Sequence, residues 1–396
     1  MKILVINAGS SSLKYQLIET EGEKTVAKGL CERIGLDGRF THKVNGEVYQ
    51  KEVAMPDHTA AFEQVKNALT TGEGKVIDNL SEVAAIGHRV VMGGSKFDRS
   101  VLITEDVLQT IRDYASLAPL HNPATVKGIE AATAAFGKDI PQVAVFDTAF
   151  HQTMPEVAYL WGLPYEYYEK YGVRRYGFHG TSHRYVSARC CELLGKPDGK
   201  GTRIITCHLG NGSSLAAIKD GKVIDTTMGL TPLDGFLMGT RSGGIDPSAV
   251  TFIMEKEGLT PTEMDAIMNK KSGMLGVSGV SSDDRDISAA MADGNPRAKL
   301  AWDMRSYQIL KYIGGYVAAL GGLDAIVFTA GIGENQDALR AELLEKMAYL
   351  GVKLDADANK VRGEEREIST PDSTVRAFVI PTNEELVIAR DTKELV

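Results

Sequence analysis

The chain has 396 residues, of which 43% are hydrophobic and 24% are charged. This length predicts two domains, and the apolar content is high enough for buried cores, which excludes a disordered or collagen-like chain. The formal net charge of −8 argues against a broad electropositive surface, so we expect no nucleic-acid partner and only local anion sites.

Segments for secretion and membrane insertion are not expected. The apolar run near the N-terminus is too short for a secretory signal, and the most apolar long stretch, residues 314–333, is interrupted by Gly321, Gly322 and Asp324. The cysteines are too few for a disulfide framework and are predicted to be structural. We therefore expect a cytoplasmic protein without a membrane span. The cysteines are Cys31, Cys190, Cys191 and Cys207.

An internal repeat is the most informative feature of the chain. Residues 5–13, Val-Ile-Asn-Ala-Gly-Ser-Ser-Ser-Leu, resemble residues 207–215, Cys-His-Leu-Gly-Asn-Gly-Ser-Ser-Leu. Each copy predicts an apolar strand, a Gly/Ser turn, a second strand and a third run that ends in Gly-Leu, at 29–30 and at 229–230. The repeat predicts a duplicated hairpin that opens two α/β domains. Chance similarity between Gly/Ser-rich turns is the alternative.

Helices and strands alternate after each copy of the repeat. In the first half, apolar spacing predicts helices over 104–115 and 123–136 and a strand over 142–146. That strand runs into Asp147, at the strand end where open α/β sheets bind ligands. The boundary between the halves is expected near residue 150.

The second half ends in two buried strands, each followed by a helix. The pattern predicts a helix over 299–320, a strand over 325–328, a glycine-rich turn, and a helix over 336–350. A strand over 377–380 precedes the last helix, which Thr382 and Glu385 are expected to begin as a capping box, leaving Glu384 for other work. We expect domains at 1–150, with the helix 384–396 packing back on it, and at 151–383.

Three Gly/Ser turns that follow strands are candidate phosphate-binding loops, although a Walker P-loop and a G-x-G-x-x-G fingerprint are absent from the sequence. They span residues 7–12, 210–214 and 331–335. Backbone N–H groups freed by small residues can hold phosphate oxygens. We expect a nucleotide gripped between the domains, with Ser10, Ser12 and Lys14 near its phosphates. Ordinary tight turns and a solvent-facing Lys14 are the alternatives.

Two arginines beside glycines, Arg89 and Arg241, suit the planar capture of carboxylate or phosphate. For each arginine taken alone, a surface ion pair is the favoured interpretation. His179 and His183 have the i, i+4 spacing of a zinc pair, but the glutamate of H-E-x-x-H and a third ligand are missing. This favours a histidine that donates to a phosphate.

The remaining candidates are carboxylates. Asp147 and Glu384 each follow a predicted strand and could support Mg²⁺, which prefers few carboxylates and several waters. Asp283 and Arg285 lie near the start of a predicted helix, where an N-cap is the alternative interpretation.

The motif at residues 5–14, together with His208–Leu215, resembles the acetate kinase family, and the similarity extends essentially along the whole chain. The resemblance implies an α/β fold of two duplicated ribonuclease-H-like (actin-like ATPase) domains around a nucleotide cleft. It also implies reversible transfer of the ATP γ-phosphoryl group to acetate, with Mg²⁺ (Mn²⁺ is possible) and a homodimer formed through the second domain. A propionate or butyrate kinase, and a nucleotide-gated ATPase of the actin or Hsp70 type, are the alternatives.

The resemblance also implies roles for individual residues. Asn7 and Glu384 match the metal positions, and Asp147, His179 and Arg241 match the catalytic ones. Substrate contacts are implied for Arg89, Val91, Leu120, Phe178 and Pro232. Nucleotide contacts are implied for Lys14, His208, Leu209, Gly210, Asn211, Gly212, Asp283, Asp284, Arg285, Gly331, Ile332, Gly333, Glu334 and Asn335. The chain departs from the family's pattern at Met92 and Ser95, where His and Glu are expected, and at Asp284, where a less polar residue is expected.

Overall fold

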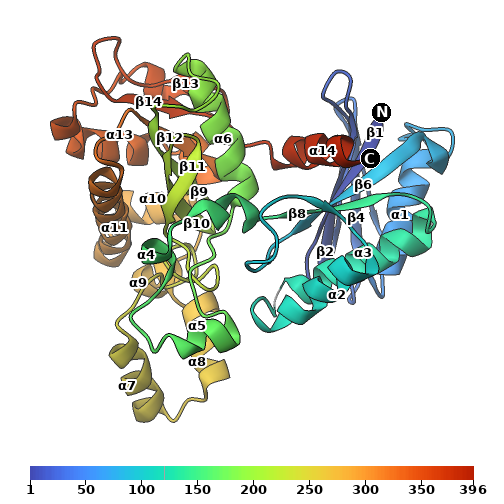
Figure 1. Cartoon of the computed structure of the whole chain (residues 1–396), viewed down its shortest axis with the longest axis horizontal. Helices are drawn as coiled ribbons and strands as arrows, with labels where there is room; N and C mark the ends of the chain where they lie inside the picture. The colour runs from blue at the N-terminus through green and yellow to red at the C-terminus, as the bar shows by residue number, and fades with distance from the viewer. Residues whose placement is uncertain (120) are drawn as a thin grey trace. The chain divides into compact units, whose positions relative to one another are not determined.

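The computed structural model describes residues 1–119 and 121–396. The described chain forms two compact units, residues 1–150 with 383–396, and residues 151–382. Each unit is built on one mixed β-sheet with helices packed against it (Figure 1). The predicted α/β class is confirmed.

The first unit contains an eight-stranded sheet in the order β5-β4-β3-β2-β1-β6-β8-β7. Its strands are β1 (Lys2–Ala8), β2 (Ser12–Glu19), β3 (Lys24–Glu32), β4 (Arg39–Val44), β5 (Glu47–Glu52), β6 (Val83–Val90), β7 (Val101–Leu102) and β8 (Gln142–Phe146). Its helices are α1 (His58–Thr70), α2 (Glu105–Asp113), α3 (Asn122–Phe136) and α14 (Glu384–Leu395), with short 3₁₀ turns at Leu80–Glu82 and Tyr114–Ser116.

Strand alternation divides the first unit into two packed layers. Because successive side chains of a strand point to opposite faces, β1 directs Leu4 and Ile6 into the core shared with α1. It directs Ile3 and Val5 into the core shared with α14. Helix α14 packs against β1, β6 and β8, so the C-terminal helix lies in the same unit as the N-terminal strand (Figure 1).

Gly87 in β6 allows this close approach of α14. A β-carbon at Gly87 would lie 2.5 Å from both Ile388 Cγ2 and Thr392 Oγ1. Such a contact is far inside van der Waals distance, so any larger residue would push the helix off the sheet.

The second unit contains a six-stranded sheet in the order β11-β10-β9-β12-β14-β13. Its strands are β9 (Arg203–Leu209), β10 (Ser213–Lys219), β11 (Lys222–Thr226), β12 (Ala325–Thr329), β13 (Arg366–Glu367) and β14 (Arg376–Val379). Its helices are α4 (Glu156–Tyr159), α5 (Glu166–Tyr171), α6 (Gly180–Leu193), α7 (Pro247–Glu257), α8 (Pro261–Lys270), α9 (Gly273–Ser278), α10 (Asp284–Ala292), α11 (Pro296–Leu320), α12 (Ala330–Asn335) and α13 (Asp337–Lys346). Short 3₁₀ turns lie at Ala149–Thr153, Ala348–Leu350 and Ala358–Lys360.

The same alternation organises the second unit. Ile205, Cys207 and Leu209 of β9 pack into the core that includes α11. Thr206 and His208, on the other face of β9, bond to side chains of α6. Helices α6 and α11 therefore lie on opposite sides of this sheet (Figure 1).

The two sheets repeat one topology, which confirms the predicted duplication. In each, three antiparallel strands (β1-β2-β3 and β9-β10-β11) are followed by two strands added in parallel (β6, β8 and β12, β14). The second copy of the third strand is shorter than expected. It ends at Thr226, before Gly229 and Leu230.

Local predictions failed at two helix starts. The glycine-rich segment 331–335 is a short helix, α12, rather than an open turn. Helix α14 is capped by Asn383, whose side chain accepts from the Leu386 N–H, so the predicted Thr382–Glu385 capping box is wrong. The Thr382 N–H instead donates to Glu334 Oε1, which holds the residue out of the capping position.

Among the described residues, no helix combines the length and the apolar character needed to cross a bilayer.

Arg340 of α13 is fully buried and ties this helix to neighbouring backbone. Its guanidinium donates to the carbonyl oxygens of Gly333, Asn359 and Val361 and to Asn359 Oδ1. Burial lowers the pKa of Arg340 to about 10, so the side chain stays charged at neutral pH. The network fixes the end of the Gly331–Asn335 segment.

We predict that Arg340→Ala lowers the free energy of unfolding by about 3 kcal/mol or more, because several buried acceptors lose their donors together. Urea denaturation measures the change. Lys346→Ala, which removes an exposed ion pair on the same helix, is the matched control and should stay within about 0.5 kcal/mol of the wild type. Equal stability of Arg340→Ala and this control would contradict the assignment.

Candidate active site

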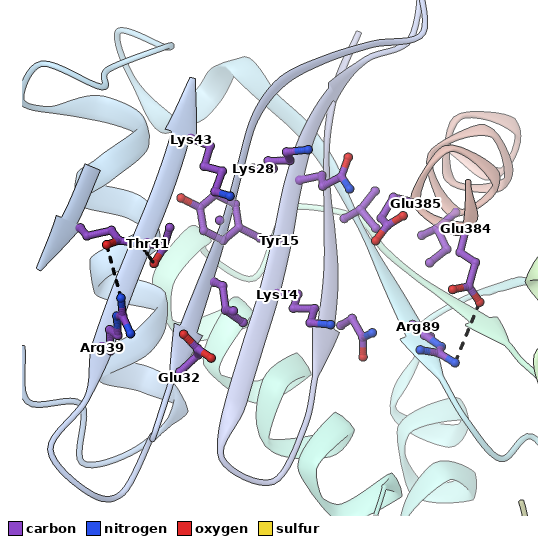
Figure 2. Close-up of a pocket in the computed structure, with 17 residues that line it drawn as sticks. Lys14, Tyr15, Lys28, Glu32, Arg39, Thr41, Lys43, Arg89, Glu384 and Glu385 are labelled. Carbon is purple, nitrogen blue, oxygen red and sulfur yellow. Dashed lines mark hydrogen bonds and ion pairs between the residues drawn. The ribbon is translucent and has the colours of Figure 1, made fainter. Parts of the chain in front are cut away.

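In the first unit, strand alternation places the predicted polar residues on one face of the sheet. Asn7 and Lys14 are direct partners in the β1–β2 ladder, and Arg89 lies two residues after Gly87 on the α14 side of β6. Glu384 is the first residue of α14. Asn7, Lys14, Arg89 and Glu384 line one pocket of about 580 Å³, and Figure 2 shows Arg89 and Glu384 pointing toward each other.

Arg89 is held by a bidentate ion pair. Its Nε donates to Asp147 Oδ1 at 3.0 Å and its Nη2 donates to Asp147 Oδ2 at 2.7 Å. Nη2 also lies 4.0 Å from Glu384 Oε1. Arg89 belongs to strand β6, so the sheet fixes the position of its backbone. Asp147 thus orients the guanidinium, and the Nη1 side is left to face a ligand.

The charges of this cluster are strongly coupled. Burial alone would lower the pKa of Arg89, but the Asp147 and Glu384 carboxylates raise it above its ordinary value. Burial and the neighbouring Asp147 charge raise the pKa of Glu384 to about 7, against the opposing effect of Arg89. Arg89 is 21% exposed and Asp147 only 1%. The cluster therefore contains one firmly charged cation and two carboxylates, of which Glu384 is poorly neutralised.

This carboxylate fits a divalent cation. Glu384 Oε1 is buried and has no hydrogen-bond partner among residues 1–119 and 121–396. A cation would favour its ionised form. Within the same described residues, no cluster of three His, Cys, Asp or Glu side chains could hold a metal by itself. The donors Glu384 and Asn7 suit Mg²⁺, which is commonly held by one or two protein oxygens together with waters and substrate phosphates.

Ser10 and Ser12 do not join this pocket. Ser10 lines a separate hollow beside His58 and Lys127, and Ser12 begins β2, where its carbonyl oxygen accepts from the Gly9 N–H at 2.8 Å. The carbonyl oxygen of Gly9 bonds to His58 Nε2. The structure thus gives the first Gly/Ser turn an internal hydrogen-bonding role, and brings Asn7 and Lys14 but not the serines to the charged pocket.

In the second unit, Gly212 marks the point where His179 and Arg241 converge. A β-carbon placed on Gly212 would lie 3.1 Å from Arg241 Nη1 and 3.7 Å from His179 Nε2. Arg241 Nη1 donates to the Pro232 carbonyl oxygen at 3.1 Å. Burial lowers the pKa of Arg241, and no carboxylate among the described residues pairs with it. A mostly buried guanidinium without a carboxylate partner is suited to an anionic ligand.

The predicted nucleotide segments meet in a second pocket of this unit, about 650 Å³ in volume. Asn211, Asp283, Asp284, Arg285, Gly331, Ile332 and Asn335 line it, together with Ser282, Ser288, Gln336 and Arg362. His208, Leu209, Gly210 and Gly333 are not among the lining residues. His208 and Leu209 belong to β9, and Gly210 follows it.

Several residues of these segments have structural duties. Asp283 caps α10 and pairs with Arg285, which agrees with the N-cap interpretation. Glu334 Oε1 accepts from the Ala330 N–H and the Thr382 N–H, so its carboxylate holds the start of α12 instead of facing the pocket.

The polar residue at 284 has a physical explanation. Asp284 forms an ion pair with Arg305 of α11, whose side chain is 4% exposed. An isolated buried arginine is costly, so it requires a carboxylate at this position. Gln336 Nε2 also donates to Asp284, at 3.4 Å.

The apolar residues predicted to contact the acetate methyl group belong to different elements. Val91 follows β6 close to Arg89, Phe178 is buried beside His179, and the carbonyl oxygen of Pro232 bonds to Arg241. Leu120 lies outside the described residues.

Sequence reasoning assigned no role in the site to three polar residues near His179. His183, Thr206 and Ser214 are fully buried and hydrogen-bonded to one another. Ser214 was part of the repeated motif, but serine in a Gly/Ser turn gives no signal of a side-chain contact. A buried His183 at helical spacing from His179 was the available clue.

Comparison with known proteins decides the family. A sequence model of the Acetokinase family matches residues 2–390. The chain belongs to the Acetokinase family. Its acetate kinase relative from Methanosarcina mazei is 56% identical, with 100% of this chain and 97% of that protein covered. The acetate kinase of Clostridium botulinum is 57% identical, with coverage of 100% and 99%.

Solved structures agree with this assignment. The acetate kinase of Porphyromonas gingivalis matches with a TM-score of 0.95 at 50% identity, covering 100% of this chain and 99% of that one. A propionate kinase from Francisella tularensis matches with a TM-score of 0.93 at 42% identity, covering both chains fully. The resemblance to the acetate kinase family and the predicted fold of duplicated actin-like ATPase domains are therefore confirmed.

The raised pKa of Glu384 predicts that the stability of the protein depends on pH when no metal ion is bound. Between about pH 4.5 and 7 the folded protein retains a proton that the unfolded chain has released, so the contribution of this group to stability falls as pH rises through that window. Glu384→Gln should remove this part of the slope and reduce the rise in melting temperature that Mg²⁺ causes at pH 8.

Denaturant titrations at pH 5, 6, 7 and 8 in the presence of a chelator measure the slope. Glu394→Gln, an exposed change in the last turn of the same helix, should leave it unchanged. An identical slope in the wild type and Glu384→Gln would contradict the assignment.

Proposed function

We propose that the protein is an acetate kinase that transfers the γ-phosphoryl group of ATP directly to the carboxylate of acetate, giving acetyl phosphate and ADP, in a reversible reaction that requires Mg²⁺. The observation that carries the proposal is the convergence of Arg241 Nη1 and His179 Nε2 at Gly212. Membership of the Acetokinase family supports the substrates.

The chemistry asks for charge stabilisation rather than a strong base. Acetate is ionised at pH 7, so no proton has to be removed before it attacks. The barrier comes from bringing two anions together and from charge on the phosphoryl oxygens, which positioned cations and N–H donors lower. Arg241 and His179 serve as those donors in the second unit.

Arg89 binds the carboxylate of acetate in the first unit. Asp147 holds Nε and Nη2 of the guanidinium, so the remaining N–H groups have a fixed direction. The family resemblance assigns Val91, Leu120, Phe178 and Pro232 to the methyl group of acetate. Asp147 acts through Arg89, because acetate offers it no proton to accept.

Mg²⁺ would be held by Glu384 and Asn7, and when bound it would neutralise phosphate charge. Lys14, near Asn7, adds a further cation. The nucleotide base and ribose occupy the second-unit pocket lined by Asp283, Arg285 and Ile332.

The protein is proposed to act as a homodimer in a reducing cytoplasm. Helix α7 has no buried residue and exposes Phe252 and Ile253, which favours a partner surface. The four cysteines are free and buried, which suits a reducing compartment.

Propionate is the alternative acceptor, because a propionate kinase has nearly the same fold. One methylene changes affinity in an apolar pocket by about 1 to 3 kcal/mol, so discrimination between the two acids is set by small differences in pocket volume.

Trapping of the acyl phosphate tests the function. Protein, Mg-ATP and acetate, propionate or butyrate are incubated with hydroxylamine, and each hydroxamate is measured beside ADP. We expect acetohydroxamate to form in step with ADP and to exceed the other hydroxamates. If propionohydroxamate dominates, propionate rather than acetate is the acceptor. ADP without any hydroxamate would indicate a nucleotide-gated ATPase.

Arg241→Ala should lower kcat by about 10² to 10⁴ with little change in the KM values, because its guanidinium acts mainly on charge that develops in the transition state. Steady-state kinetics in the acetyl phosphate-forming direction measures this. Arg189→Ala, which removes a surface ion pair of α6, is the control. A change confined to KM would overturn the role.

A further inference from the structure

Four buried side chains connect the core of the second unit to His179. Thr206 Oγ1 lies 2.7 Å from His183 Nδ1, and His183 Nε2 lies 2.8 Å from Ser214 Oγ. Ser214 Oγ lies 2.9 Å from His179 Nδ1. We refer to Thr206, His183, Ser214 and His179 as the hydroxyl–imidazole chain. Its outer end is His179 Nε2, the atom near Gly212 and Arg241.

The surroundings hold His179 in one orientation. Its ring stacks on His208, with 4.0 Å between centroids, and His208 is the direct ladder partner of Ser214 across β9 and β10. His179 precedes α6 with φ 58° and ψ 23°, a left-handed conformation that is unfavourable for any residue with a side chain. Such a conformation persists where surrounding contacts fix it.

The protons in this chain can be arranged in three ways while both rings are neutral. Burial lowers the pKa of His183 well below its ordinary value, so its ring carries one N–H. The Ser214 hydroxyl donates to His179 Nδ1, donates to His183 Nε2, or accepts from both rings. The Ser214 hydroxyl has a single proton, so it cannot donate to both rings.

We propose that Ser214 is a positioning residue that donates its proton to His179 Nδ1 and so keeps the N–H of a neutral His179 on Nε2. Ser214 Oγ then accepts from His183 Nε2–H, and His183 Nδ1 accepts from the Thr206 hydroxyl. Each of the other two arrangements would put the His179 proton on Nδ1 and leave a lone pair on Nε2, the atom near Arg241. The inference rests on the proposed function, in which His179 donates to the phosphoryl group.

The first test reads the tautomer of His179 without any substrate. The full-length protein is labelled with ¹⁵N in its histidine rings, and the His179 resonances are identified by their loss in His179→Gln. We expect the wild type to carry its proton on Nε2. In Ser214→Ala the ring should move toward a mixture of tautomers. A wild-type proton on Nδ1, or a doubly protonated ring, would overturn the proposal.

Thr206 offers a matched pair that separates proton direction from packing. Thr206→Val keeps the shape and loses the hydroxyl, whereas Thr206→Ser keeps the hydroxyl and loses a methyl group. The valine variant should disturb the His179 tautomer and the serine variant should not. If the serine variant disturbs the tautomer as much as the valine variant does, Thr206 serves packing alone and the proposed hydroxyl–imidazole chain is contradicted.

Kinetics provides the second readout. Ser214→Ala should lower kcat by about 10- to 100-fold, the cost expected for a misdirected group, with KM for ATP and acetate within about twofold. Ser306→Ala, which removes a fully buried hydroxyl from α11, should leave kcat unchanged. A changed tautomer with unchanged kcat would overturn the positioning role.

The two proposals fail in different ways. If the wild type forms no hydroxamate, the proposed function fails, while the tautomer measurements still report on the direction of the chain. If hydroxamate forms and Ser214→Ala leaves both tautomer and kcat unaltered, only the present inference fails.

Discussion

Arg89 and Asp147 extend from neighbouring parallel strands and meet through two N–H···O bonds, and Arg89 lines a pocket together with Glu384. This ion pair determines how much of the Arg89 charge is left to neutralise Glu384. One guanidinium lies near two carboxylates. Asp147 forms the bidentate pair with it, whereas Glu384 is only partly neutralised and has a pKa of about 7. A cation bound beside Glu384 would favour its ionised form at neutral pH. The proposed Mg²⁺ site rests on this imbalance.

The two units position their polar site residues in the same way. Successive residues of a strand point to opposite faces, so Asn7 shares the α14 face of its sheet with Ile3 and Val5, and Thr206 and His208 lie on the α6 face of theirs. A helix packed on that face begins with a functional residue. Glu384 starts α14, and His179 precedes α6. Each unit therefore has a polar residue at the start of a helix that packs against the first strand of its hairpin.

Much of this could be predicted from the chain. The repeat of residues 5–13 at 207–215 predicted the duplicated hairpins, and the strand over 142–146 ended at Asp147 as expected. The ion pair of Arg89 could not be predicted, because it depends on the spatial alignment of strands separated by more than fifty residues. Asp284 departed from the expected pattern, and its partner, the buried Arg305 of α11, could be identified only from the structure. The cap at Asn383 and the bonds of Ser214 were also inaccessible, since short polar side chains form local contacts that depend on tertiary packing.

Direct transfer between two bound anions is the central claim, because every assigned group neutralises charge or positions a ligand and none is assigned as a phosphoryl acceptor. The stereochemical course at phosphorus tests it most directly. ATP made chiral at the γ-phosphorus with oxygen isotopes is converted to acetyl phosphate, and the configuration of the transferred group is determined. The account predicts inversion, the result of a single in-line displacement. Retention would contradict it, since two successive transfers through a phosphorylated side chain would then be required.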